Sequence, residues 1–328
     1  MNASNATNAT NATNAVNGND TGAPRVLVGY SPDERGDDAL ALAALLARTM
    51  DAPLTAAHVH PPPWPTPGPG AVDAEWVAYL RGQADEALRR AAARLGELGV
   101  PERAVDLRVH AHRSSGRGLL QVAAEAGAGL IVAGSAPRGR RGRVAIGSTA
   151  DQLLHGSPVP VMLAPRGYAA HPPKRFARMT VAYWRHRDGE GPLTAAAALA
   201  DRLGVELRLL TLVLRPPGLA AKFRAPGGVL DRQLAQAEED LRYAAGMFGG
   251  GTPVERLTAV GTDIAKTLGT VDMLHGEVLA CLSSREGPLR KVFLGETSGK
   301  IVRAAPCPVL LLPRGAAAPT VGEKAQVR

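Results

Sequence analysis

Aromatic residues are scarce in this sequence, at 4% of 328 residues, so the hydrophobic cores must be built mainly from Ala, Leu and Val. Cysteine is scarcer still. The two cysteines, Cys281 and Cys307, lie late in the chain and lack the spacing of a metal site. We interpret both as small buried apolar residues.

Long apolar runs are also absent. No segment approaches the roughly 20 consecutive apolar residues that cross a bilayer, and the N-terminus lacks the basic patch and apolar stretch of a secretory signal. These absences predict a soluble, cytoplasmic protein without a membrane partner. Residues 1–24 repeat Asn-Ala-Thr and contain almost nothing that could pack, which predicts a disordered tail. We expect residues 316–328 to form a second flexible tail.

Positive charge is what the chain has in excess, with a formal net charge of +8 that comes largely from arginine. Such a balance permits anionic partners, including nucleotides and nucleic acids, without requiring one. Hydrophobic residues at 45% and charged residues at 21% are typical of globular proteins. The length is sufficient for two domains that each bury a core.

Short apolar runs alternate with Ala- and Leu-rich segments of helical spacing. Five strands are predicted first, at Arg25–Ser31, Leu54–His60, Val105–His110, Gly129–Ala133 and Val161–Ala164. The helices predicted between them are Asp37–Met50, Glu75–Leu98, Gly118–Ala126 and Ser148–His155. This alternation predicts an α/β, Rossmann-like domain, an open five-stranded parallel sheet with helices on both faces.

The same order then recurs. The corresponding strands are Met179–Trp184, Glu206–Leu214, Val254–Val260, Val278–Leu282 and Val309–Leu312. The closing segments match at a constant offset of 148 residues, from Gly147 to Gly295 and from Pro165 to Pro313. A repeat this long indicates duplication of a whole domain. We therefore predict a first domain at 25–167, a linker at 168–174 and a second domain at 175–315.

The loop from Gly134 to Thr149 is the best candidate for binding phosphate. Open parallel sheets bind ligands beyond the carboxyl ends of their strands, and this loop follows the fourth strand. Glycine lets the backbone approach a ligand closely, and the helix that begins near Ser148 offers unpaired N–H groups. Hydroxyl groups are supplied by Ser135, Ser148 and Thr149, and four arginines lie between Arg138 and Arg143.

The spacing of this loop resembles the Gly-x2-Gly-x9-Gly-Ser/Thr signature of the ATP-binding universal stress proteins, and the similarity covers nearly all of residues 25–315. The resemblance implies two domains of the adenine-nucleotide α-hydrolase-like type and a stress-response regulator that binds ATP, with or without Mg²⁺, or AMP. It also implies that one chain is equivalent to a family dimer, with the two fifth strands meeting near a pseudo-two-fold axis. A further protein partner, not identified by the sequence, and a homodimer of the whole chain are both compatible with this role. The residues to which the resemblance assigns nucleotide contact are Gly29, Ser31, Val59, Ala133, Gly134, Ser135, Gly147, Ser148 and Thr149.

The sequence departs from that signature in both repeats. Pro137 stands at the position of the second glycine and cannot donate an N–H, and Ser31 stands where the family usually has aspartate. In the second repeat, Leu282 and Arg285 replace the first two glycines and Glu296 replaces the serine. We therefore expect the first domain alone to bind nucleotide. A carboxylate repels phosphate, although Glu296 at a helix start is equally explained as a favourable first-turn residue.

Other interpretations remain open. The arginine cluster is typical of a solvated loop, and it lacks the interleaved aromatics of single-strand nucleic-acid sites. The pairs His58/His60 and His110/His112 permit a metal site but lack a third ligand of convincing spacing, so structural roles are favoured. Asp37-Asp38 at a helix start is explained by capping. The rivals to nucleotide-dependent regulation are a nucleotide-free interaction protein and a slow ATP hydrolase, for which the sequence supplies no identifiable base.

Overall fold

The computed structural model describes residues 23–62, 71–185, 189–215, 228–248, 254–283 and 295–313. Within these residues the first half contains strands β1 (Arg25–Gly29), β2 (Leu54–His60), β3 (Val105–Ala111), β4 (Ala128–Gly134) and β5 (Val161–Ala164). Its helices are α1 (Glu34–Met50), α2 (Ala71–Glu97), α3 (Ser115–Ala126) and α4 (Ser148–Leu154), with a 3-10 turn η1 (Glu102–Ala104). Residues 1–22 of the tail predicted at 1–24, the tail predicted at 316–328, and Arg285 lie outside the described residues.

The second half repeats this order after a 3-10 turn, η2 (Tyr168–Ala170), at the predicted linker. Its strands are β6 (Arg178–Ala182), β7 (Glu206–Leu214), β8 (Glu255–Gly261), β9 (Glu277–Leu282) and β10 (Val309–Leu312). Its helices are α5 (Glu190–Leu203), α6 (Val229–Gly246), α7 (Ile264–Gly269) and α8 (Glu296–Ala304). None of the helices among the described residues combines the length and apolar character of a membrane span.

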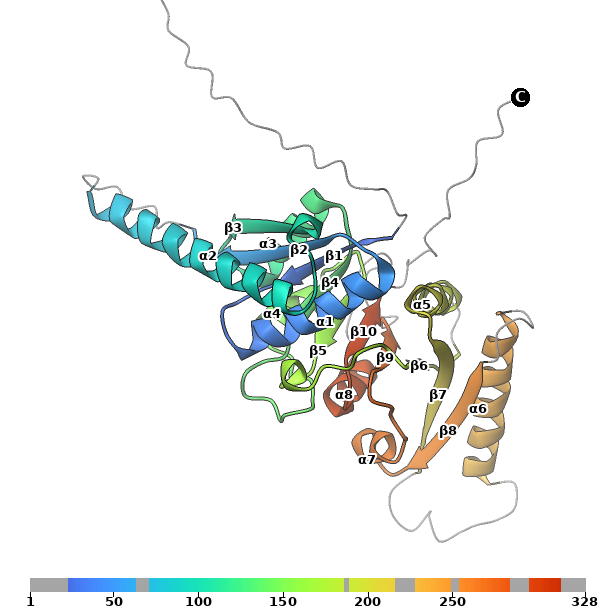
Figure 1. Cartoon of the computed structure of the whole chain (residues 1–328). Coiled ribbons are helices and arrows are strands. Elements are labelled where there is room, and N and C mark those ends of the chain that lie inside the picture. Colours follow the sequence, from blue (N-terminus) through green and yellow to red (C-terminus); the bar gives the residue numbers. More distant parts are fainter. Residues whose placement is uncertain are drawn as a thin grey trace, which may run out of the picture.

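The strands form one continuous sheet in the order β3-β2-β1-β4-β5-β10-β9-β6-β7-β8 (Figure 1). Each half is a parallel five-stranded unit, as predicted, and the two units share a sheet through antiparallel pairing of β5 with β10. The central pair in this register is Met162 opposite Leu310. The expected meeting of the fifth strands is confirmed, and it produces one sheet of ten strands because edge pairing satisfies the backbone groups of both edges.

The core lies in two layers, one on each face of the sheet. Alternate residues of a strand point to opposite faces, so Val26 and Val28 of β1 join one layer and Leu27 joins the other. The first layer packs under α1, α2, α5 and α6, and the second under α3, α4, α7 and α8. Both cysteines are buried as predicted, and burial raises the pKa of Cys281 and of Cys307 to about 12.

The start of α1 differs from the prediction. The residue that caps this helix is Asp33, whose carboxylate accepts hydrogen bonds from the amides of Arg35 and Gly36 at 3.0 and 3.2 Å. The expectation that Asp37-Asp38 caps it is wrong. Asp38 is buried one turn inside the helix and accepts hydrogen bonds from the amides of Gly167 and Ala169, both at 2.8 Å, so it fixes the chain that leaves β5.

Candidate functional site

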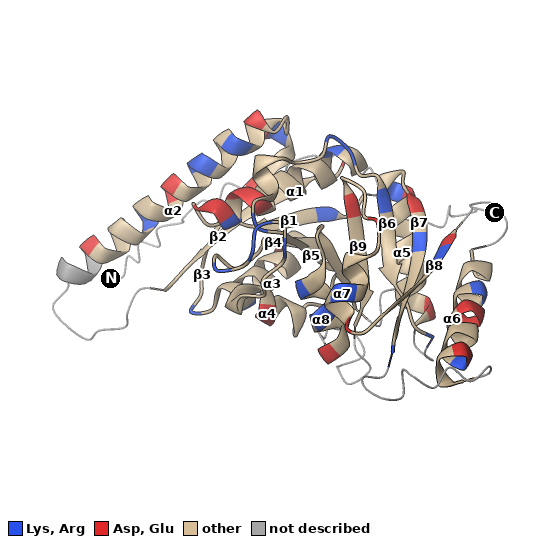
Figure 2. Ribbon diagram, turned by 90° about the horizontal axis from the view of Figure 1, so that it is seen from below, with Lys and Arg blue, Asp and Glu red and all other residues tan. Residues whose placement is uncertain are grey.

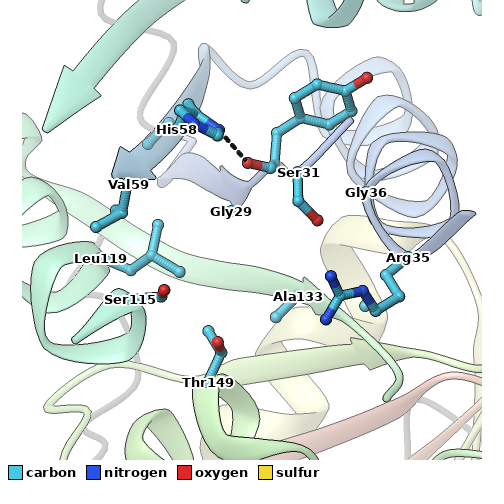
Figure 3. A pocket seen from close by; sticks show the side chains of 13 residues that line it. Gly29, Ser31, Arg35, Gly36, His58, Val59, Ser115, Leu119, Ala133 and Thr149 are labelled. Atoms are coloured by element: carbon cyan, nitrogen blue, oxygen red, sulfur yellow. Dashed lines mark hydrogen bonds between the residues drawn. The ribbon is translucent and has the colours of Figure 1, made fainter. Parts of the chain in front are cut away.

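A cavity of about 160 Å³ opens at the carboxyl ends of β1, β2 and β4 (Figure 3). In the first half, β1 lies between β2 on one side and β4 on the other, so the strand order reverses there. This is the place where open parallel sheets bind ligands. Six of the nine residues predicted for the site line the cavity: Gly29, Ser31, Val59, Ala133, Gly134 and Thr149.

The floor of the cavity is apolar. It is formed by Val59 from β2, Leu119 from α3 and Ala133 from β4. Gly29 makes room for this floor, since a Cβ atom at that position would lie 2.6 Å from Cδ1 of Leu119. An apolar floor of this kind suits an aromatic ring more than a charged group.

Polar groups surround this floor. Figure 3 shows the hydroxyl groups of Ser31, Ser115 and Thr149 and the guanidinium group of Arg35 turned toward the same space. These four side chains come from separate segments, namely the loop after β1, α3, α4 and α1. Arg35 and Ser115 carry no part of the glycine signature, so sequence spacing alone did not identify them.

Arg35 is held in place by the helix cap. Its guanidinium group pairs with the Asp33 carboxylate at 2.5 Å, and the Ser31 hydroxyl donates to the same carboxylate at 3.0 Å. Burial alone would raise the pKa of Asp33, but the hydrogen bonds from Arg35, the Gly36 amide and Ser31 hold that pKa below its usual value. An ionised Asp33 therefore positions a cation and a hydroxyl at the cavity.

His58 forms part of the cavity wall, and its Nδ1 atom lies 3.1 Å from the carbonyl oxygen of Tyr30. Because a carbonyl oxygen only accepts, Nδ1 carries the proton of this hydrogen bond. Burial lowers the pKa of His58, so the ring is neutral at pH 7 and Nε2 is left as an acceptor. No three His, Cys, Asp or Glu side chains gather into a metal-holding cluster in the described part of the chain.

The three remaining predicted residues do not line the cavity. Ser135 is buried, and its hydroxyl accepts a hydrogen bond from the Ala145 amide at 2.7 Å. Gly147 precedes α4 and Ser148 begins it, with Ser148 exposed. Pro137 is exposed in the loop and also stays outside the cavity lining, so it does not fill the site.

The loop after β4 folds back on itself. Its amides at Ala136, Gly139, Gly142, Arg143 and Ala145 all donate hydrogen bonds within the protein. Arg166 reinforces this arrangement, since its guanidinium group donates to the Gly139 carbonyl at 2.8 Å. The five amides are therefore not available to a phosphate, in contrast to the expectation of a backbone cradle.

Glycine is required at position 134 by a close contact between β4 and α1. A Cβ atom at this position would overlap the carbonyl oxygen of Arg35, because β4 ends directly against the first turn of α1. Glycine here permits that contact. The contact in turn brings Arg35 and Ala133 to the same cavity.

The equivalent positions of the second half carry bulkier side chains. Trp184, Leu212 and Leu282 stand where the first half has Ser31, Val59 and Gly134. Trp184 and Leu212 are half-buried and pack against the core layer under α7 and α8. Glu296 begins α8 with an exposed side chain that pairs with Lys300 at 2.6 Å.

Comparison with known proteins matches both halves to one family. The model of the universal stress protein family matches residues 23–165 and again 176–313. Universal stress proteins of Mycobacterium bovis and Mycobacterium tuberculosis are each 37% identical over 297 residues, which cover 88% of this chain and 99% of the relative.

Solved structures agree with this match at the level of the fold. A universal stress protein from Archaeoglobus fulgidus superposes with a TM-score of 0.61 at 18% identity, over 89% of this chain and 98% of that one. A putative universal stress protein from Pseudomonas aeruginosa gives 0.56 at 17% identity, over 90% and 95%. This chain belongs to the universal stress protein family, with two copies of the family domain in tandem.

Proposed function

We propose that the first half binds an adenine nucleotide, ATP with or without Mg²⁺ or AMP, and that binding regulates a non-catalytic stress-response role of the whole chain. The observation that supports this is the cavity at the strand-order reversal, with an apolar floor and a polar rim. The adenine ring would lie on Val59, Leu119 and Ala133. The ribose and phosphate groups would extend toward the hydroxyls and Arg35.

The size of the cavity limits how the ligand lies. At about 160 Å³ it is smaller than the roughly 300 Å³ at which pockets for drug-sized ligands begin. The enclosed part therefore suits the base, and the phosphates must lie at the open mouth. Arg35 is the cation of this lining, and its planar guanidinium group is suited to bidentate contact with a phosphate.

A matched pair of variants tests this proposal. Ser31→Trp copies the second half into the first and should weaken ATP and AMP binding at least tenfold, about 1.4 kcal/mol, because the indole occupies the mouth. Trp184→Ser makes the reverse change in the second half and should leave both affinities unchanged. Isothermal titration calorimetry measures them. Wild-type protein that binds neither nucleotide, or equal affinities in wild type and Ser31→Trp, would overturn the proposal.

A third variant measures the contribution of Arg35 to phosphate binding separately from binding of the adenosine part. Arg35→Gln should lower the affinity for AMP about tenfold and leave the affinity for adenosine within twofold, because only the nucleotide carries a phosphate for the guanidinium group. Equal losses for AMP and adenosine would instead show that the substitution disturbs α1. Sustained ATP turnover by the purified protein would contradict a non-catalytic role.

One observation favours a nucleotide-free interaction protein as the second candidate. The five loop amides that would cradle a triphosphate are bonded within the protein. A ligand that binds only the native state must raise its stability, by about 2.7 kcal/mol at one hundred times Kd. Absence of any thermal stabilisation by ATP, AMP or adenosine would select this second candidate.

A further inference from the structure

A second and larger cavity lies where the two halves meet, on the loop that follows β4. It has a volume of about 550 Å³ and is walled by residues 140 and 143–146 of the first half and by α7 and the end of α8 of the second. Four of its lining side chains are cationic, Arg140, Arg143, Lys266 and Arg303, and none of the lining residues is acidic. We call this the inter-half groove.

The cations of the groove are only partly neutralised. Lys266 lies 3.4 Å from the carboxylate of Asp263, and both side chains are exposed. Across the described residues, neither Arg140 nor Arg303 forms an ion pair within 4.0 Å. In Figure 2 the ribbons of α7 and α8 lie side by side, and both carry basic segments. Like charges gathered along one groove raise the local potential and attract anions.

Arg143 is fixed in the groove before any ligand arrives. Its guanidinium group donates to the carbonyl oxygen of Ala304, the last residue of α8, and its amide donates to the carbonyl of Arg140 at 3.1 Å. This contact bridges the two halves of the chain. A cation that is already ordered loses less conformational entropy when it binds an anion.

The groove favours a small ligand with several phosphate groups. Its four cations come from three separate segments and line a cavity of about 550 Å³, so a ligand with several phosphate groups can use more of them than a single phosphate group can. The apolar residues between the cations, such as Val144 and Ile146, are aliphatic. These aliphatic side chains carry no hydrogen-bonding groups, so the four cations supply the side-chain polar contacts to a ligand. We propose that the inter-half groove binds a linear polyphosphate chain, whether inorganic or carried by a nucleotide, and that the bound chain joins the β4 loop to α7 and α8.

Calorimetry with sodium tripolyphosphate tests this directly on the full chain. The double variant Lys266→Gln/Arg303→Gln should bind at least tenfold more weakly than wild type. Both side chains are exposed, so the variant is expected to fold. The matched control, Arg89→Gln/Arg90→Gln on the exposed face of α2, removes the same charge elsewhere and should change the affinity less than twofold.

Parallel titrations distinguish the sources of the phosphate. Inorganic tripolyphosphate should keep its affinity in Ser31→Trp, because that variant changes only the cavity of the first half. If the phosphate chain is carried by a nucleotide, ATP should show a second binding event that Lys266→Gln/Arg303→Gln removes and AMP lacks. Failure of the nucleotide proposal would leave the tripolyphosphate result intact.

Four results would overturn the proposal. The first is no tripolyphosphate binding by wild type, and the second is an equal loss of affinity in the groove variant and the α2 control. The third is an affinity for sulfate equal to that for tripolyphosphate, which would assign the groove to small anions in general. The fourth is displacement of tripolyphosphate by a single-stranded oligonucleotide, which would assign the groove to nucleic acid. Binding should weaken as salt rises, because exposed charges are screened.

Discussion

The carboxyl ends of the strands differ between the two halves, although the strands that form them are equivalent. In the first half Gly29, Ser31 and Gly134 leave a cavity open. In the second half larger residues stand at the same positions, Ala182, Trp184 and Leu282. The same positions therefore carry small side chains beside the cavity in the first half and larger side chains in the second.

The amino ends of the strands show the opposite contrast. In the second half the buried carboxylate of Glu277 accepts hydrogen bonds from Arg208 at 2.7 Å, from Arg178 at 2.9 Å and from Thr180. The equivalent of Glu277 in the first half is Gly129, and there Arg25 reaches Thr55 only at 3.4 Å. The half with the larger residues at the carboxyl ends of its strands is thus the one with the buried ionic cluster.

Removing the buried carboxylate should have the largest effect on stability. Glu277→Gln keeps the shape of the side chain but removes the buried charge partner of Arg208 and Arg178, which are then left with the partly exposed carboxylate of Glu255, 3.0 Å from Arg178 and 3.9 Å from Arg208. We expect the free energy of unfolding to fall by about 3–5 kcal/mol in urea denaturation. The control is Asp106→Asn in the first half, where the carboxylate pairs with Arg108 at 2.7 Å on a partly exposed strand. It should cost less than about 1 kcal/mol, and equal losses would remove the contrast between the halves.

Gly134→Ala should have an intermediate effect. The added methyl group overlaps the Arg35 carbonyl, so β4 and α1 must move apart, at a cost of about 1–3 kcal/mol in the free energy of unfolding. Gly82→Ala on α2 is the control, because nothing lies within 4 Å of the added Cβ atom. That variant should be more stable by about 0.5–1 kcal/mol. A harmless Gly134→Ala would mean that the close contact is not required.

The smallest effect on stability is expected at His58, which donates a hydrogen bond to the Tyr30 carbonyl. The equivalent residue in the second half is Thr211, which donates to the Tyr183 carbonyl at 2.8 Å. Because burial lowers the pKa of His58 below its ordinary value of 6.5, the unfolded chain binds a proton more readily than the folded one. Stability should therefore fall as pH drops from above 6.5 through the lower folded-state pKa.

His58→Thr copies the second half and should reduce this pH dependence. Urea denaturation of wild type and His58→Thr at pH 7.5 and at pH 5 measures the difference. We expect the wild type to lose more stability between the two values than the variant does. An identical loss in both proteins would show that other groups account for the acid sensitivity.

Most of the fold could be predicted because each apolar run marks one strand. The bounds of β2, β5, β7 and β10 agree with the sequence analysis. The starts of α1 and α3 were placed three residues late, at Asp37 and Gly118. The reason is the same in both places: small and turn-forming residues near the helix start conceal its first turn.

Apart from Thr149, which the glycine signature places at the start of α4, the site could be predicted only where it follows strand ends. Gly29, Ser31, Val59, Ala133 and Gly134 come after or within strands, and topology brings such residues together. Arg35 and Leu119 reach the cavity through the packing of helices, which no local spacing encodes. The closed form of the β4 loop depends on Arg166, 27 residues from Gly139, and so was equally hidden.

The pairing of β5 with β10 has a consequence for how the two halves could diverge. Two strands of one polypeptide meet at a fixed local concentration, so their contact survives dilution. A symmetric dimer of identical subunits must carry every substitution twice, once on each side of its axis. Here Trp184 stands on one side and Ser31 on the other. Covalent connection thus allows a division of labour that two identical copies could not achieve.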